Sequence, residues 1–303
     1  MKSNSRRFAV VDVLLIILII LPLVLGMVLK ILTTPVSEGI SITGAQIYFT
    51  IPMPIQDLPI TSAQINSWLV IISLLGICLY MTHGLNVKKP TKRQHLAEWI
   101  VEKTQSMVNE SMGDFFRSYG PFIAAIIGLS AFSSLLSLLG LFPPTSDINV
   151  VAGWAIGVFV LITYYKLKGG FLNYLKGFTE PIFVMAPLNV LGEIATPISM
   201  AFRHYGNVLS GSVIAVLIAA ALQALSSLVL GWLPGALGEI PFLQIGLPAI
   251  LSIYFDVFSG CMQAYIFAML TMLNIAGAFP EEEYEKRKQK KLSKNNKKLQ
   301  TNT

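Results

Sequence analysis

The chain has 303 residues, of which 54% are hydrophobic and only 13% are charged. Soluble globular proteins carry about 25% charged residues, so this composition predicts a polytopic membrane protein and excludes an ordinary soluble domain. The net charge of +6 does not indicate a nucleic-acid partner, because eight of the 22 lysine and arginine residues lie in a C-terminal tail and most others flank apolar segments. Cys78 and Cys261 lie in apolar tracts and are interpreted as buried packing residues. No histidine or cysteine cluster has metal-ligand spacing, so neither a metal nor another cofactor is expected.

The first apolar tract covers residues 8–32 and follows Lys2, Arg6 and Arg7. It is long enough to span a membrane. A signal peptide has the same basic start, but its apolar core is shorter; we favour a retained helix and keep a signal-like segment as the alternative. Residues 34–66 form a connector without lysine or arginine, and the β-formers in "ISITGAQIYFTI" predict a small element at the outer surface.

Three further spans are predicted at residues 67–85, 121–142 and 150–165. Apolar residues recur at helical spacing over residues 96–117. This pattern predicts an amphipathic helix on the membrane surface or against a partner, or equally an ordinary helix packed on the protein itself. Two longer apolar tracts follow, and the charged tail after Pro280 is expected to be disordered at its end.

The charge of the connecting segments predicts the topology. Lysine and arginine gather in the N-terminus, residues 86–93, residues 166–176 and the tail, whereas residues 33–66, 142–149 and 233–247 contain none. These two sets alternate along six spans, so the positive-inside rule places both termini in the cytoplasm. Lys30 is the one mild exception. Removal of the first segment would leave five spans and an outside N-terminus.

The last two tracts are too long for upright spans. Residues 198–232 number 35, which as a helix extend about 52 Å, against a hydrocarbon core of about 30 Å. Residues 248–279 show the same excess, and an average tilt of about 20° cannot absorb it. The predicted fold is therefore an all-α polytopic membrane protein with five to six transmembrane helices, the last two long and strongly tilted.

Each of these tracts carries a polar stripe at helical spacing. The first stripe comprises Thr196, Ser199, Arg203, Asn207 and Ser210, with Asn189 and Glu193 upstream. The second comprises Ser252, Asp256, Ser259, Gln263 and Asn274. An arginine inside a membrane costs about 2.5–3.5 kcal/mol on insertion scales, so it is a functional candidate. The alternative is a structural salt bridge from Arg203 to Asp256 or Glu193.

Three segments resemble one family. The stretch "TPISMAFRHYGNVLSG" resembles the signature helix of subunit a of the F-type ATP synthase, whose pattern is close to P-x-S-x-x-x-R-x-[FY]-[GA]-N. The last tract, "FDVFSGCMQAYIFAMLTMLNI", is similar to the C-terminal helix of that subunit, and "PPTSDINV" to its connector before the fourth span. The segments occur in the family's order, the similarity extends from about Ser67 to Gly277, and the joint match is highly specific.

The resemblance implies that Arg203 is the essential arginine, which faces the ring of c subunits and interacts with the ring's ion-binding carboxylate. Asn207 and Gln263 match the family's asparagine and glutamine, and Asp256 falls where members carry Glu or His. Two aqueous half-channels would carry H⁺ or Na⁺ to and from the ring and so couple ion flow to ATP synthesis or hydrolysis. The other candidate ion-translocation residues are Glu193, Ser212, Ser199, Asn189 and Asn274.

The resemblance also implies the surroundings of the chain. Its partners would be the c-subunit ring, the peripheral-stalk b subunits, other ATP synthase subunits and the lipid bilayer. It would lie in a bacterial-type plasma membrane and have no catalytic site of its own. The chain then divides into an N-terminal membrane helix (1–33), an outer connector (34–66), a core with half-channels (67–279) and a basic cytoplasmic tail (280–303).

Three residues depart from the family pattern. Ser212 replaces a residue that is Glu or His in many members, and Glu193 lies about one helical turn nearer to the arginine than the acid of many members. His204 replaces a usual apolar residue and is interpreted as hydrogen-bonded at the subunit interface, with a proton relay as the alternative. These departures leave the coupling ion open.

Other functional classes are less well supported by the sequence. A secondary transporter with Arg203 as its substrate site would be expected to contain internal repeats, and none is found. A purely structural membrane subunit would hold Arg203 in a salt bridge. An intramembrane enzyme would need a nucleophile and base or a metal-ligand pattern, and neither is present.

Overall fold

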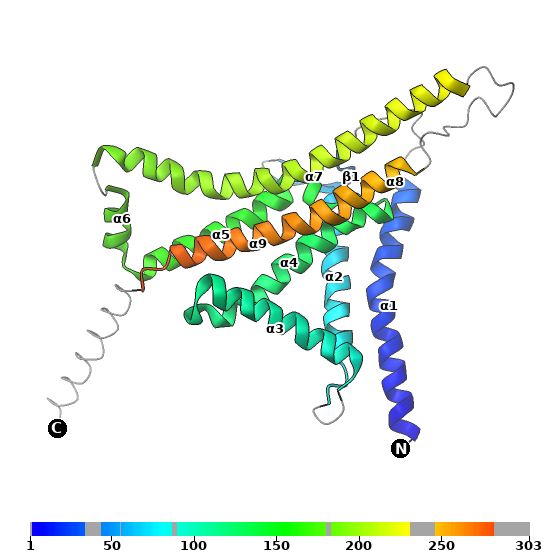
Figure 1. The fold of residues 1–303 in the computed structure, drawn as a ribbon, viewed down its shortest axis with the longest axis horizontal. Coiled ribbons are helices and arrows are strands. Elements are labelled where there is room, and N and C mark those ends of the chain that lie inside the picture. The colour runs from blue at the N-terminus through cyan, green and yellow to red at the C-terminus, as the bar shows by residue number, and fades with distance from the viewer. Residues whose placement is uncertain are drawn as a thin grey trace.

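The computed structural model describes residues 2–33, 44–54, 56–86, 90–179, 183–230 and 246–281. Within these ranges the chain is almost entirely helical, which confirms the predicted all-α class (Figure 1). The α-helices are α1 (Lys2–Thr33), α2 (Ser62–Thr82), α3 (Lys92–Met112), α4 (Gly120–Leu135), α5 (Ile148–Lys168), α6 (Phe171–Thr179), α7 (Ala186–Leu230), α8 (Leu247–Ser252) and α9 (Gly260–Gly277). Short 3₁₀ helices cover Asp114–Tyr119, Leu136–Leu139, Pro144–Ser146 and Phe183–Met185, and a π-helical segment covers Ile253–Ser259.

Among the described residues, six helical stretches are long and apolar enough to cross a membrane. They are Val10–Thr33, Ser62–Thr82, Asp114–Leu139, Ile148–Lys168, Phe183–Val229 and Ile253–Gly277. The predicted spans are thus confirmed, although their boundaries shift by several residues; α2, for example, begins at Ser62, five residues before the predicted start. The side chain of Thr61 caps this helix by accepting a hydrogen bond from the Gln64 backbone N–H (3.4 Å), so polar residues form its first turn.

The first connector contains the expected small element, which is a pair of strands; its position at the outer surface stays a prediction. Strands β1 (Ile47–Ile51) and β2 (Leu58–Thr61) pair antiparallel, with Ile51 opposite Leu58 and an irregularity between Ile47 and Phe49. The Ser62 backbone N–H donates to the Gln46 carbonyl (2.7 Å), which ties this hairpin to the start of α2.

Helix α1 packs along α2, side by side with it in Figure 1. Gly76 permits the close approach, because a Cβ there would lie 2.9 Å from Ile19 Cγ1. Nearby, the Ser73 hydroxyl donates to the Ile19 carbonyl (3.0 Å). At the C-terminal end of α1, the Lys30 ammonium donates a hydrogen bond to the Gly140 carbonyl. Lys30, the one exception to the charge pattern, is therefore bound within the protein.

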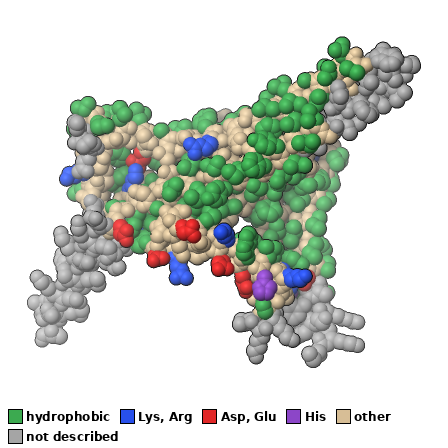
Figure 2. All heavy atoms as spheres, in the orientation of Figure 1, with side chains coloured by type: hydrophobic (Ala, Val, Ile, Leu, Met, Phe, Trp, Pro, Cys, Tyr) green, Lys and Arg blue, Asp and Glu red, His purple; other side chains and the backbone are tan. Residues whose placement is uncertain are grey.

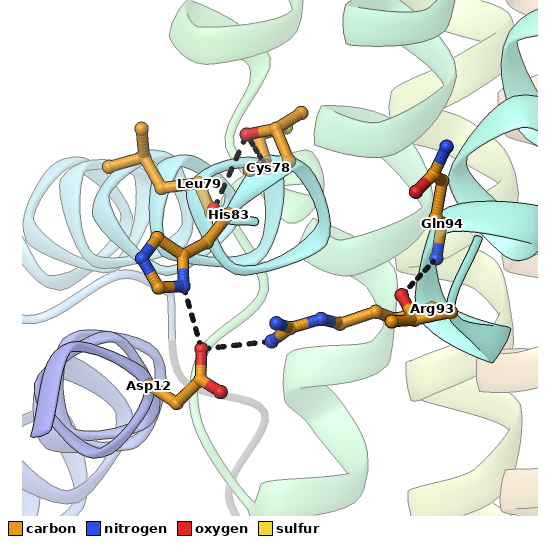
Figure 3. Close-up of polar contacts among 8 residues, drawn as sticks. Asp12, Cys78, Leu79, His83, Arg93 and Gln94 are labelled. Atoms are coloured by element: carbon orange, nitrogen blue, oxygen red, sulfur yellow. Dashed lines mark hydrogen bonds and ion pairs between the residues drawn. The ribbon is translucent and has the colours of Figure 1, made fainter. Parts of the chain in front are cut away.

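Near its start, α1 is joined to α2 and α3 by charged groups (Figure 3). Asp12 Oδ1 accepts a hydrogen bond from Arg93 Nη1 and lies within 2.9 Å of both that atom and His83 Nδ1. The Arg93 guanidinium also lies over the Tyr80 ring, 5.0 Å from its centroid. Three helices therefore meet at one carboxylate.

The core forms where α3, α4, α5 and α9 meet. Gly260 allows α9 to approach α4 closely, because a Cβ there would lie only 2.6 Å from Ser134 Cβ. At the far end of α9, Phe279 stacks on Phe115 with ring centroids 4.3 Å apart and makes edge contacts with Phe116 and Tyr165. This aromatic cluster fixes the ends of α5 and α9 beside the 3₁₀ helix that follows α3.

The amphipathic segment packs on the protein itself through its second half, and a contact of its first half with the membrane surface or a partner stays a prediction. Val108, Met112 and Phe116 are buried in the core, whereas Leu96 and Ile100 are exposed. Figure 2 shows acidic and basic side chains gathered over this helix, α3, while hydrophobic side chains cover the visible face of α1. The interpretation of Cys78 and Cys261 as buried packing residues is wrong, because both thiols are exposed. In a membrane protein an apolar tract can face outward, so apolar surroundings in sequence do not imply burial.

The two long tracts lie across the bundle. In Figure 1, α7 and the α8–α9 stretch run side by side at a steep angle to α1 and α2, which confirms the predicted pair of strongly tilted helices. Helix α7 has 45 residues, continues through Pro197 and is about 68 Å long. The other stretch contains the π-helical segment, whose wider turn shifts the predicted polar stripe around the helix. The predictions for residues 233–245 and for the tail beyond Glu281 lie outside the described residues.

Candidate functional site

Arg203 lies on α7 with its side chain exposed. Among the described residues it has no ion pair or hydrogen-bond partner. The alternative of a salt bridge from Arg203 to Glu193 or Asp256 is therefore wrong within this chain. Glu193 is instead paired with Lys166, and Asp256 is partly buried in the π-helical segment.

The surface around Arg203 is apolar and uncovered. Ile198, Phe202 and Ile214 of the same helix are 50%, 60% and 41% exposed. Ser199 and Ser210, which share the predicted stripe with Arg203, are also exposed. An unpaired guanidinium thus stands on an apolar helix face that no other described part of the chain covers, a combination typical of a face that meets another membrane component.

The next residue of the stripe faces the neighbouring helix. Asn207 Nδ2 donates to Ser259 Oγ (2.9 Å), and Ser259 Oγ donates back to Asn207 Oδ1 (3.1 Å). One turn further, Gly211 lets the π-helical segment approach α7, since a Cβ there would lie 3.0 Å from the Phe255 ring. The two predicted stripes therefore meet through Asn207 and Ser259.

Two further predicted residues, Gln263 on α9 and Ser212 on α7, do not join the two stripes by hydrogen bonds. Gln263 is buried, with 3% of its surface exposed, and makes no hydrogen bond to Arg203. The Ser212 hydroxyl donates to the Leu209 carbonyl of its own helix (2.8 Å) and makes no hydrogen bond to Asp256. The side chain of Ser252 lies outside the described part of the chain.

His204 points away from the exposed face and is fully buried. Its Nε2 lies 3.2 Å from the Ser130 hydroxyl, and its ring makes edge contacts with Phe267 and Trp154 at centroid distances of 5.4 and 6.0 Å. The expected hydrogen bond is thus confirmed, but its expected place at a subunit interface is wrong. The imidazole belongs to the chain's own core, about 100° around the helix from Arg203.

Glu193 is the centre of a second group of polar residues, beside the ends of α5 and α9. Its Oε1 atom lies 3.1 Å from Lys166 Nζ and accepts a hydrogen bond from the Tyr174 hydroxyl (3.1 Å). Tyr174 comes from α6 and Lys166 from the last turn of α5. Burial and the hydrogen bond to Glu193 raise the pKa of Tyr174 to about 12, so at neutral pH the phenol is a donor.

Two cavities open beside this carboxylate. One of about 240 Å³ is bounded by Lys166, Glu193, Thr196 and Asn274, and one of about 570 Å³ by the first three of these together with Tyr174 and Asn189. Asn189 donates to the Phe178 carbonyl (2.9 Å), and Asn274 Nδ2 lies 3.6 Å from Met200 Sδ. Three predicted residues, Glu193, Asn189 and Asn274, therefore line one hollow region.

The sequence did not single out Lys166 and Tyr174 as site residues. The charge pattern of the loop accounts for a lysine at residue 166 by topology alone, because the positive-inside rule places basic residues there. The available signal was its position directly after an apolar span, where a long side chain can turn back toward a partner inside the protein.

Fold and site together define a class: a multi-pass α-helical membrane protein that presents an unpaired arginine on a long tilted helix. Residues 64–276 match the model of the family described as ATP synthase A chain. This stretch is more than half of the chain and includes the first long tract and most of the second. The chain belongs to this family, that of ATP synthase subunit a.

Individual relatives agree with the family match. The chain is 32% identical over 225 residues to ATP synthase subunit a of Trichlorobacter lovleyi, covering 73% of this chain and 88% of the relative. It is 31% identical over 220 residues to ATP synthase subunit a of Geobacter sulfurreducens, covering 71% and 86%. It is also 26% identical over 279 residues to a Propionigenium modestum protein described as ATP synthase subunit a, sodium ion specific, covering 80% and 88%.

Proposed function

We propose that this chain is the stator subunit that conducts H⁺ or Na⁺ through two half-channels to and from a c-subunit ring, and so couples ion translocation to ATP synthesis or hydrolysis. The observation that carries the proposal is the exposed Arg203 side chain, which has no ion-pair partner among the described residues of its own chain. A charge in the membrane without an internal partner is best explained by a partner on another chain.

Arg203 acts in this proposal through its permanent charge. A guanidinium does not lose its proton inside a protein, so it attracts a ring carboxylate in the ionised form and makes each passing site release its ion. The same fixed charge repels cations in a region of low dielectric constant. It therefore blocks direct leakage of ions from one half-channel to the other.

The cavities beside Glu193 are assigned to the half-channel on the cytoplasmic side, with Asn189, Thr196 and Asn274 as lining residues. The assignment is supported by the basic residues of the adjoining segment 166–176, which the positive-inside rule places in the cytoplasm. We assign Asp256, Ser212 and Ser199 to the ion path as well. Asn207, through its hydrogen bonds to Ser259, would keep α7 in register with the π-helical segment beside the arginine. Gln263 is assigned to the ion path as well.

The proposed setting is a bacterial-type plasma membrane with both termini in the cytoplasm. The partners would be the c ring on the exposed face of α7, the peripheral-stalk b subunits and the other subunits of the synthase. The subunit would have no catalytic site of its own, because ATP chemistry would take place in the soluble head of the complex.

The coupling ion is a separate part of the proposal. The Propionigenium modestum relative is described as sodium ion specific, at 26% identity. This likeness keeps sodium as a candidate beside the proton. ATP hydrolysis by the purified complex, measured with and without sodium, distinguishes the two: stimulation by sodium indicates a sodium-coupled subunit.

Arg203→Ala tests the proposed function. We expect the complex to assemble and to hydrolyse ATP, but ATP-driven ion pumping into inverted membrane vesicles should be lost, since no fixed charge then releases the ring's ion. Arg117→Ala is the matched control, because Arg117 is an exposed arginine outside α7; it should pump like the parent. Coupled pumping by assembled Arg203→Ala would overturn the proposal.

A further inference from the structure

The carboxylate of Glu193 is already occupied by a cation that belongs to the protein. The Lys166 ammonium and the Tyr174 hydroxyl both lie 3.1 Å from the same oxygen, Glu193 Oε1. Only 8% of the Glu193 side chain is exposed, against 33% of the Lys166 side chain. Lys166 is therefore the more accessible member of the pair, and the carboxylate is largely covered.

Lys166 and Glu193 are the charged side chains among the described residues that bound both cavities. Their electrostatic environment is thus set mainly by this one pair. A mobile cation that approaches Glu193 is repelled by the ammonium until the ammonium moves aside, because the two cations compete for the same oxygen.

We propose that Lys166 is a tethered counter-ion that gates the ion path at Glu193: its ammonium holds the carboxylate between passages and is displaced by each passing cation. The inference rests on the proposed ion-conducting function and adds a residue that controls access to this half-channel.

The chemistry of the three side chains suits such a gate. Lysine carries a compact charge on a flexible four-carbon stem, so its ammonium can swing toward water without movement of the backbone. Tyr174 is a protonated donor from α6 and keeps the carboxylate in place while the ammonium moves. An arginine here would bind the carboxylate through two parallel hydrogen bonds and would be harder to displace.

The main test uses the complete synthase in inverted vesicles. The measured quantity is the concentration of coupling ion, H⁺ or Na⁺ as the parent requires, that half-saturates ATP-driven pumping. In Lys166→Met we expect this concentration to fall severalfold, because no tethered cation competes at Glu193. In Lys166→Arg it should stay at the parent value or rise. In a Glu193→Gln background, Lys166→Met should have no further effect, since the site of competition is gone.

Lys168→Met is the matched control. Lys168 belongs to the same segment but lies over the rings of Tyr165 and Tyr164, 4.5 and 5.0 Å from their centroids, and bounds neither cavity. It should leave half-saturation unchanged. Tyr174→Phe removes the other donor and keeps the ammonium, so its effect should be much smaller than that of Lys166→Met. Parent-like half-saturation in Lys166→Met, or an equal fall in Tyr174→Phe, would overturn the gate.

A second measurement does not depend on assembly of the lysine variants. Thr196 bounds both cavities, so Thr196→Cys, with Cys78 and Cys261 replaced by serine, places a single thiol there. In the otherwise unchanged complex a cationic thiol reagent should react more slowly than an uncharged reagent of similar size. Faster reaction of the cationic reagent would contradict a gating ammonium.

The failure of the gate can be told apart from the failure of the proposed function. If Arg203→Ala retains coupled pumping, the assignment of the ion-conducting function itself falls. If Arg203→Ala loses pumping while Lys166→Met behaves like the parent, only the gating role of Lys166 is lost.

Discussion

Arg203 and His204 are neighbours in sequence but occupy opposite environments. Arg203 is exposed on the apolar face of α7, and His204 is fully buried among Ser130, Trp154 and Phe267. A rotation of about 100° per residue around the helix is enough to separate them. The charged group is therefore available to another chain, while the imidazole is a part of the packing between α4, α5, α7 and α9.

The burial of His204 leads to a prediction about stability. His204→Ala removes a buried ring and leaves the Ser130 hydroxyl without its partner, which should destabilise the subunit by on the order of 2–3 kcal/mol. We expect a lower thermal midpoint of the purified complex, with the number of ions pumped per ATP unchanged in the folded fraction. His95→Ala is the control, because 64% of the His95 side chain is exposed and its removal leaves no cavity. A parent-like midpoint together with lost pumping would instead indicate a proton relay.

At the scale of single elements, α1 is the element whose presence in the mature protein is most open to question from the sequence. A signal peptide is removed from the mature protein, so it is not expected to pack closely against a later helix. Here Gly76 of α2 receives Ile19, the Ser73 hydroxyl binds the Ile19 carbonyl, and Asp12 joins His83 and Arg93. These contacts are those of a packed transmembrane helix.

We therefore predict that α1 is retained and lies against α2. The pair Ile19→Cys and Gly76→Cys, in a chain with Cys78 and Cys261 replaced by serine, should form a disulfide under mild oxidation, because a Cβ at residue 76 would lie 2.9 Å from Ile19 Cγ1. Reduction should reverse a mobility shift on a denaturing gel. Ile19→Cys with Gly153→Cys is the control pair, since a Cβ at residue 153 would meet no heavy atom within 4 Å outside its own helix turn. A subunit that lacks its first 33 residues would contradict the prediction.

The whole molecule combines upright and inclined helices. In Figure 1, α1 and α2 run nearly parallel to each other, whereas α7 and α9 cross the bundle at a steep angle. The long helices thus expose an extended apolar face, and a partner that moves along this face comes past Arg203. The cavities at Glu193 lie near one end of this pair.

The alternation of charged and uncharged connectors predicts the sidedness of the molecule. Gly44→Cys, before the hairpin, should react with a membrane-impermeant thiol reagent in intact cells, because its connector carries no lysine or arginine. His95→Cys on α3 should react only after the membrane is opened. Both variants need the background without native cysteines, since Cys78 and Cys261 are exposed. The reverse pattern of labelling would invert the proposed topology.

The class of the protein, its five to six spans, a small element in the first connector and the tilt of the last two helices can all be predicted from the amino-acid sequence. Each of these follows from local properties: the length of apolar tracts, the bilayer thickness and the residue types of a connector. The sequence also selected Arg203, because a charge in an apolar tract is costly wherever the helix points.

Which polar groups meet can be seen only once the helices are packed together. The π-helical segment changes the phase of the second stripe, so Asn207 pairs with Ser259 while Gln263 is buried without a hydrogen bond to Arg203. Glu193 receives Lys166 and Tyr174 from two other helices, and Arg203 receives no partner from the described part of the chain. Such pairings depend on crossing angles and close approaches between distant segments, such as those at Gly211 and Gly260, and helical periodicity within one segment carries no information about them.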